Sequence, residues 1–375
     1  METRTDRSSA AGRVLFLAYL TLVVSAAWFH PRPDWDLAGY AGCALEWSVE
    51  DAERLQRETF ADLEASLTPS EMADLTGRNA YRRTMASDAE SFRQQLPFYR
   101  ARAVHVGALA ALHRLGFSFL QAAAAISALS TLVLGLIIFR WISLHIGGLA
   151  GALSAIGVLV AADALGTARS MTPDALSAAL FVGALYTLVE GRRPRAALFL
   201  ALTSLLARPD NLLPALAVLI ALWRAGRGAW AMTTPRFALC SGLLIAVTAG
   251  AAALADAHGW WVVFSHSFGG WIERPELSVP AFSWSAYAAT VAGALGQLHS
   301  LPVAILGLGC GAAWVAGRRT WLERPLFALC LAVAVSVLVR FALFPSLSPR
   351  LLTGSLAVVG VMALAAVGEA PSDEQ

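Results

Sequence analysis

The stretch Pro31-Arg32-Pro33-Asp34-Trp35-Asp36-Leu37-Ala38-Gly39-Tyr40 opens a polar segment, residues 30–102, directly behind the first apolar run of the chain. This segment holds half of the 26 carboxylates. The remaining sequence is mainly Leu, Ala, Val and Gly, interrupted by single arginines. Binding and catalytic residues concentrate on loops that a rigid scaffold holds in place, so we look for chemistry in this polar segment first.

The composition is that of a protein with many membrane spans. Of 375 residues, 57% are hydrophobic and 14% are charged, and the mean hydropathy is +0.60, whereas soluble domains are about 25% charged. All 28 basic residues are arginine, which excludes lysine chemistry. The four cysteines form no CxxC pair, so neither a zinc site nor a disulfide framework is indicated.

Ten segments are apolar enough to be candidate spans, although a crossing needs roughly 20 residues and the fifth and sixth segments have only 13 residues each. They are residues 12–29, 118–140, 144–165, 174–190, 195–207, 211–223, 237–256, 300–316, 325–344 and 351–367. The sequence therefore predicts an all-α integral membrane protein with about ten transmembrane helices, forming a single polytopic domain over residues 1–375.

Arginine clusters set the expected orientation, because cytoplasmic loops carry the positive excess. A cytoplasmic N-terminus places four clusters on the cytoplasmic side: Arg140; Arg192, Arg193 and Arg195; Arg224, Arg227 and Arg236; and Arg318, Arg319 and Arg324. Residues 30–117 then form an extracytoplasmic loop, and residues 368–375 form a disordered cytoplasmic tail. We expect both termini in the cytoplasm, and a bacterial inner membrane as the location.

Helices are also expected inside the extracytoplasmic loop. Apolar residues three and four apart predict an amphipathic helix over Ala41–Ser66, and Thr68 with Pro69 predicts a capped start for a second helical stretch that ends near Gln95. These two helices would lie on the membrane and cover the bundle. Residues 103–116 are apolar but short, and counting them as a crossing would invert every later loop, so we expect a helix at the outer surface.

Asp34 and Asp36 are the first candidates for chemistry. If the run is extended, both carboxylates point to one side where the first span leaves the bilayer. Paired acids there could act as a general base, as an acid/base pair with separated pKa values, or as ligands of a divalent cation. The spacing alone does not establish a metal site, and a polar collar at the span end is the alternative.

A basic group follows Phe98 and Tyr99. The guanidinium groups of Arg100 and Arg102, together with His105, could bind a lipid phosphate through paired hydrogen bonds. Alternatively, they could hold the surface helix among phospholipid headgroups.

Charged residues in or beside spans are costly to bury, at about 2.5 to 3.5 kcal/mol each at mid-helix, so each is a candidate site. They are Asp163, Arg169, Asp174, Arg208, Asp210, Arg340 and Arg350. Asp174 begins a helix, where the helix dipole alone could explain it. Arg208 and Asp210 lie at a break between two short helices, and Arg350 precedes the last span.

The last outer loop, between His258 and His299, is rich in tryptophan. An interfacial aromatic belt explains these side chains, and stacking on a sugar ring is the alternative. The sequence contains no phosphate-binding Walker loop, dinucleotide fingerprint or hydrolase motif.

This layout resembles the GT-C superfamily of integral membrane glycosyltransferases. The likeness rests on the acids behind the first span, on Phe98-Tyr99-Arg100-Ala101-Arg102, on Thr172-Pro173-Asp174-Ala175-Leu176 and on Ala207-Arg208-Pro209-Asp210. It is closest to the branch with the protein mannosyltransferases and the lipid A aminoarabinose transferase. The sequence departs from that pattern at Arg102-Ala103-Val104-His105, where relatives often have Pro-Leu-Tyr.

The resemblance implies transfer of a sugar from a polyprenyl-phosphate donor to a lipid, glycan or protein acceptor at the outer membrane face. It implies that Asp34 or Asp36 is the base of an inverting displacement, and that Arg102, Arg208 and Arg350 hold the donor phosphate with His105, Asp174 and Asp210 nearby. No organic cofactor and no nucleic acid is expected, and membrane lipids are expected partners. A lipid or solute transporter or flippase, and a non-catalytic scaffold, are the alternatives.

Overall fold

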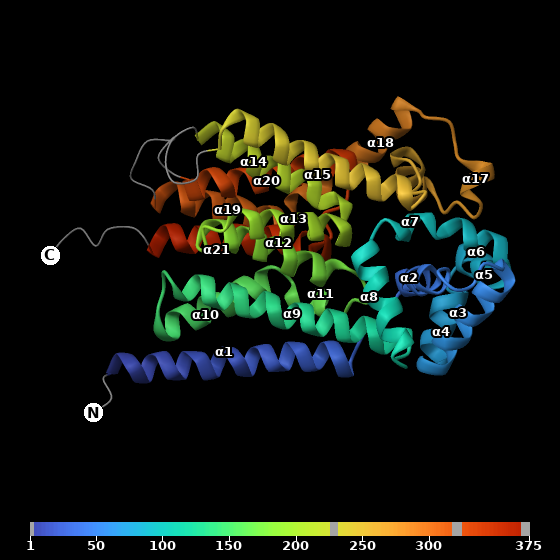
Figure 1. Ribbon diagram of the computed structural model, residues 1–375, viewed down its shortest axis with the longest axis horizontal. Helices are drawn as coiled ribbons and strands as arrows, with labels where there is room; N and C mark the ends of the chain where they lie inside the picture. Colours follow the sequence, from blue (N-terminus) through green and yellow to red (C-terminus); the bar gives the residue numbers. More distant parts are fainter. Residues whose placement is uncertain (1–3, 226–231, 317–324, 369–375) are drawn as a thin grey trace.

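The computed structural model describes residues 4–225, 232–316 and 325–368. The regular secondary structure of this part of the chain is helical, apart from one isolated bridge between Arg32 and Ser170. The bundle consists of α1 (Arg4–Phe29), α9 (Phe119–Ser143), α10 (Gly148–Ala161), α11 (Ala164–Arg169), α12 (Asp174–Val189), α13 (Pro194–Ala207), the turn η1 (Pro209–Asn211), α14 (Leu212–Ala225), α15 (Thr234–Leu254), α19 (Leu301–Ala316), α20 (Pro325–Leu343) and α21 (Pro349–Gly368). Most of these helices run side by side (Figure 1).

Two smaller groups of helices lie at one end of the bundle (Figure 1). We call the first the island; it comprises α2 (Trp35–Leu45), α3 (Ala52–Ser66), α4 (Pro69–Gly77), α5 (Ala80–Ser87), α6 (Ala89–Gln95) and α7 (Pro97–Arg100), and it is joined to the bundle by α8 (Ala103–Arg114). The second comprises α16 (Trp260–Phe264), η2 (Ser265–Gly269), α17 (Pro275–Ser278), α18 (Trp284–Ala294) and η3 (Leu295–His299). The start of α1 and the end of α21 lie at the opposite end.

Among the described residues, five helices are long and apolar enough to cross a membrane, and a sixth span arises if a bent helix pair counts as one. The five stretches are Ser9–Phe29, Phe119–Ser143, Thr234–Leu254, Leu326–Leu343 and Pro349–Ala366, and the bent pair is Trp284–His299 with Leu301–Trp314. These helices indicate an integral membrane protein.

A helix occupies each of the ten predicted span positions, but the count of ten spans is not established. The helices α10 and α13 have 14 residues each, so each covers about 21 Å at 1.5 Å per residue, less than the roughly 30 Å of a hydrocarbon core. Of the predicted tail, residues 369–375 lie outside the described part of the chain, and Gly368 ends α21.

The island has a hydrophobic core of its own, instead of two helices lying on the membrane. Leu37, Leu63, Met85, Phe92 and Leu96 are fully buried members of this core. The single helix expected over Ala41–Ser66 was wrong: α2 ends at Leu45, and a new helix begins behind Asp51, whose side chain accepts a hydrogen bond from the backbone N–H of Arg54 at 2.7 Å. Such a cap starts a new helix at the expense of a continuous one.

Two local predictions in this region hold. Thr68 and Glu71 form a reciprocal capping box at the start of α4, with Pro69 in the first turn. The segment 103–116 forms the helix α8, which lies across the bundle helices where the bundle meets the island (Figure 1).

Candidate functional site where the island meets the bundle

The acid pair Asp34 and Asp36 lies at the start of α2. Asp34 is the N-cap of α2 and has the extended backbone typical of that position, and its Oδ1 atom accepts a hydrogen bond from the N–H of Asp36 at 3.1 Å. The extended run predicted for both acids is therefore wrong beyond Asp34, because the helix begins at Trp35. The helix start still leaves both carboxylates on one side.

Arg350, from the beginning of the last helix, binds both of these acids. Its Nη1 atom is 3.1 Å from Oδ2 of Asp34, and its Nη2 atom is 3.2 Å from Oδ2 of Asp36. The three side chains keep 32 to 37% of their surface exposed. The carboxylates are therefore fixed by a guanidinium group and remain open to a ligand.

A second, buried set of charges continues from Arg350 into the bundle. Arg350 Nε is 4.0 Å from Oδ2 of Asp174, the first residue of α12, and Asp174 Oδ1 forms an ion pair with Arg208. Arg208 also binds Asp210 through Nε at 3.0 Å and Nη2 at 2.8 Å. Arg340 then binds Asp210 at 3.0 Å through Nε.

Positive and negative side chains alternate along this network, which explains how so many charges can lie together. A buried charge without a partner is strongly destabilising, whereas a paired one is tolerated. The Asp174 side chain is only 4% exposed, and it also accepts a hydrogen bond from the Thr172 hydroxyl at 2.7 Å. The structure thus brings Asp174, Arg208 and Asp210 together with Arg350, and their binding role stays a prediction.

Arg102 stands beside this network with a different set of neighbours. Within the described residues, no carboxylate lies within ion-pair distance of Arg102. Its guanidinium carbon is 5.8 Å from the ring centre of Tyr40 and 5.9 Å from that of Tyr99, and its Nη1 atom donates to the carbonyl of Phe98. Because aromatic faces and one carbonyl do not neutralise a cation, Arg102 is able to receive an anion.

Tyr99 connects Arg102 to the acid pair. Its hydroxyl donates to Oδ1 of Asp36 at 3.4 Å, and its ring meets the ring of Tyr40 edge-on at 5.0 Å. Sequence reasoning did not assign Tyr99 or Tyr40 to the site, although both lie in the quoted stretches that hold the acids and the arginines.

His105 differs from the expectation of a phosphate ligand. It is fully buried, its ring meets Tyr40 at 4.8 Å, and neither ring nitrogen has a hydrogen-bond partner. Burial lowers the pKa of His105 most, the charge of Asp174 acts in the opposite direction and that of Arg102 lowers the pKa as well, which leaves the ring at about 3. The neutral ring of His105 packs against Tyr40, behind Arg102. Within the described residues, no contact joins this ring to Asp34 or Asp36.

The pKa of Asp34 is suited to proton transfer near neutral pH. Burial raises this pKa most, the negative charge of Asp36 raises it further, and Arg350 acts in the opposite direction, which leaves the carboxyl at about 7. A general base works best when its pKa is near the working pH. Asp34 can therefore both lose and accept a proton under physiological conditions.

An apolar groove of about 480 Å³ lies between the island, α8 and the helices α13 and α15, and its walls do not include the charged residues of the cluster. Its walls come from Cys43, Glu46, Trp47, Arg100, Ala103, Val106, Leu206, Val247, Gly250, Ala251, Leu254 and Ala255. Ala103 follows Arg102 directly, and Leu206 lies two residues before Arg208.

Arg100, expected as a phosphate ligand, is instead paired with Glu46, with Nε 2.7 Å from Oε2.

The geometry does not favour a divalent cation at Asp34 and Asp36. In the part of the chain that the structure covers, no group of three or more His, Cys, Asp or Glu side chains is placed to hold a metal ion. The carboxylates of the cluster face guanidinium groups, and these neutralise them already.

No protein-family model matches this chain, and comparisons with curated proteins and with solved structures find no match. The likeness to the GT-C superfamily therefore stays a prediction from the sequence motifs.

Proposed function

We propose that this protein is a membrane glycosyltransferase that moves a sugar from a polyprenyl-phosphate donor to an acceptor at the island end of the bundle. The observation that carries the proposal is the junction of Asp34, Asp36 and Arg350 beside an unpaired Arg102 and an apolar groove. The proposal includes ten crossings, with both termini in the cytoplasm and the island outside.

Each part of the junction has a role in an inverting displacement. Asp34, with a pKa near 7, takes the proton of the acceptor hydroxyl, and the oxygen of that hydroxyl forms the new bond to the anomeric carbon. The bond from that carbon to the phosphate oxygen breaks, and the leaving polyprenyl phosphate keeps the electron pair. Arg350, which binds both acids, and the backbone N–H of Asp36 keep Asp34 in position.

Arg102 would stabilise the phosphate that leaves. Donors directed at the place where negative charge develops are often the largest single contribution to catalysis. The other arginines of the cluster already neutralise carboxylates, so Arg102 has the free positive charge that a phosphate needs. The groove that begins beside Ala103 would take the lipid chain of the donor from the side.

The binding step can be tested with undecaprenyl phosphate, the lipid that such a transfer would release. Native mass spectrometry of the protein in nanodiscs should show this lipid bound to the wild type and strongly reduced binding to Arg102→Gln. Arg54→Gln, at an exposed pair with Glu58, is the control and should bind like the wild type.

Equal binding by all three proteins would contradict the role of Arg102. Sugar transfer can be followed in proteoliposomes that contain a lipid-linked sugar and a water-soluble acceptor. If the lipid crosses the bilayer in this assay and no glycosidic bond forms, the protein is a flippase, and the transferase proposal fails.

A further inference from the structure

The segment from Leu277 to Ala316 contains no Asp, Glu, Lys or Arg. In the structure it forms α18, η3 and α19, and the two helical arms meet at Ser300 with a bend of 62°. Together, these arms are as apolar as a membrane span. A run of forty uncharged residues that bends at one end of a bundle is unusual for a loop in water.

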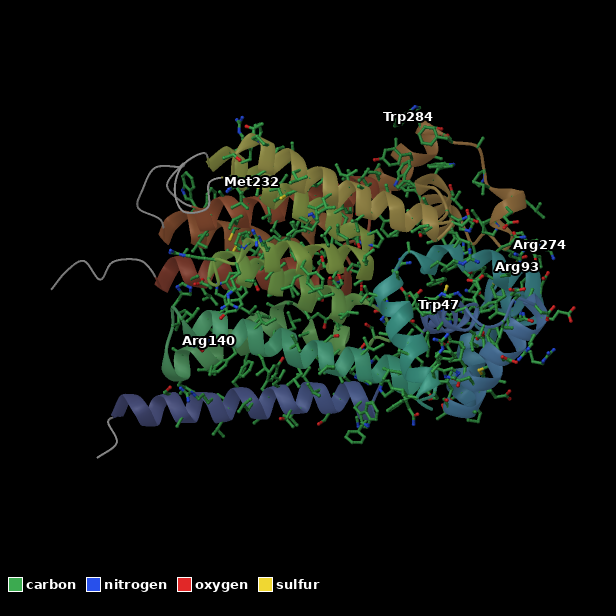
Figure 2. All side chains as sticks on the ribbon, in the orientation of Figure 1. Trp47, Arg93, Arg140, Met232, Arg274 and Trp284 are labelled. Carbon is green, nitrogen blue, oxygen red and sulfur yellow. The ribbon has the colours of Figure 1, made fainter. Side chains whose placement is uncertain are left out.

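The first arm, α18, is exposed. No residue of α18 is buried, and Trp284, at its start, is 74% exposed. Leu277 and Phe282, just before the helix, are 74% and 46% exposed. Figure 2 shows Trp284 at the outer edge of the molecule, pointing away from the bundle. Exposed apolar surface of this kind marks a contact with a partner or with lipid.

Polar groups of this region turn inward, toward the end of α20. The Tyr287 hydroxyl donates to the carbonyl of Ala342 at 2.6 Å, and the Trp260 indole donates to the carbonyl of Leu343 at 2.9 Å. Gln297 accepts from the N–H of Leu347 at 2.9 Å. The last backbone groups of α20 are thus satisfied by side chains, as required where water is scarce.

Along the bundle axis, α18 lies at the level where a candidate span would reach the membrane boundary. In Figure 1, α18 lies level with the end of α15 that faces the island, while α17 lies farther out, beside the island helices. Thr234–Leu254, which is α15, is one of the candidate spans. A tryptophan at this level, on an uncharged helix that continues into α19, fits the headgroup boundary of a bilayer.

We propose that residues 279–300 are a membrane-inserted elbow, whose apolar face, with Phe282 and Trp284, contacts the lipids of the leaflet at the island end. Lipid is the occupant that the sequence favours, because a surface for a second protein would normally carry a polar rim, and this segment has no charge to supply one. The elbow also holds the end of α20, which lies close to Arg340 and precedes Arg350 in the chain.

Spin labels can locate the elbow directly. The full chain, with its four cysteines replaced by alanine, receives one new cysteine and a nitroxide label, and is reconstituted into phosphatidylcholine/phosphatidylglycerol nanodiscs. The label at Trp284→Cys should be relaxed strongly by oxygen, which concentrates in lipid, and weakly by a water-soluble nickel chelate. It should match Leu308→Cys on α19, which is 74% exposed, and be opposite to Glu64→Cys on the exposed face of α3.

Accessibility to the nickel chelate equal to that of Glu64→Cys would place the elbow in water and overturn the proposal. Protection from both reagents would show a protein contact, such as a second copy of the chain, and would overturn it as well. If Trp284→Cys does not give a monodisperse protein, Phe282→Cys carries the same test. The result does not depend on glycosyl transfer, so either proposal can fail without the other.

Discussion

The Nη2 atom of Arg350 lies 3.2 Å from Oδ2 of Asp36, although 314 residues separate them in the chain. The contact joins the first helix of the island to the last helix of the bundle. Through Asp174, the same guanidinium group adjoins the buried guanidinium groups of Arg208 and Arg340, which the partly exposed Asp210 joins. The open acids and the buried network are therefore parts of one arrangement.

Replacing Arg350 by glutamine should abolish most activity and change stability little. Its hydrogen-bonded partners Asp34 and Asp36 are about one third exposed, and the buried Asp174 keeps its ion pair with Arg208. Ion pairs of exposed groups contribute about 1 kcal/mol or less. Loss of the guanidinium nevertheless releases both acids from their positions. Turnover and thermal unfolding of Arg350→Gln and of the control Arg54→Gln provide the measurement, and wild-type turnover of Arg350→Gln would refute this role.

Activity should depend on pH through Asp34. A base must be deprotonated, and a carboxyl with a pKa of about 7 is increasingly protonated as the pH falls below that value. We expect kcat/KM to fall about tenfold per pH unit on the acid side and to level off above the pKa. In Asp36→Asn the midpoint should move to lower pH, because the charge that raises the pKa of Asp34 is gone. An unchanged midpoint would contradict the assignment.

Arg208→Gln should destabilise the protein by about 3 to 5 kcal/mol, since it leaves a buried carboxylate at Asp174 without its partner. The double variant Arg208→Gln with Asp174→Asn should recover part of this loss, because the unpaired charge is then absent. Unfolding in a denaturant series measures both. Equal stability of the single and double variants would show that Asp174 is not the cause.

Filling the groove should weaken use of long lipid chains. Gly250 lines the groove, and a Cβ atom there would meet nothing within 4 Å, so Gly250→Phe places a ring in the groove without a clash at the backbone. We expect KM to rise for a long polyprenyl donor and to stay unchanged for a short-chain analogue. Gly242, equally open and outside the groove lining, gives the matched control Gly242→Phe. The same KM change in both variants would exclude the groove as the lipid site.

Local features could be predicted from the sequence, because their causes lie within a few residues. Examples are the capping box of Thr68 and the break at Arg208-Pro209-Asp210, now the turn η1. The break between α2 and α3 was missed, because the apolar spacing continues through it while Asp51 starts a new helix. Patterns of hydropathy do not reveal such competition between a cap and a continuous helix.

The composition of the site could be predicted only in part. Charge in apolar surroundings pointed to Asp174, Arg208, Asp210 and Arg350 individually. Which charged side chains pair with one another could not be derived, since the partners are 2 to 316 residues apart in the chain and their contacts depend on how distant helices pack. The same limit explains His105, whose burial behind Tyr40 depends on how α8 packs on α2.

The central claim is that Asp34 is the base of a sugar transfer. The direct measurement is turnover of wild type and Asp34→Asn in proteoliposomes supplied with polyprenyl-phosphate sugars and an acceptor. We predict transfer by the wild type and a loss of about 10² to 10⁴ in kcat for Asp34→Asn, with binding of undecaprenyl phosphate retained. Wild-type turnover by Asp34→Asn, or no transfer by the wild type from any such donor, would contradict the account.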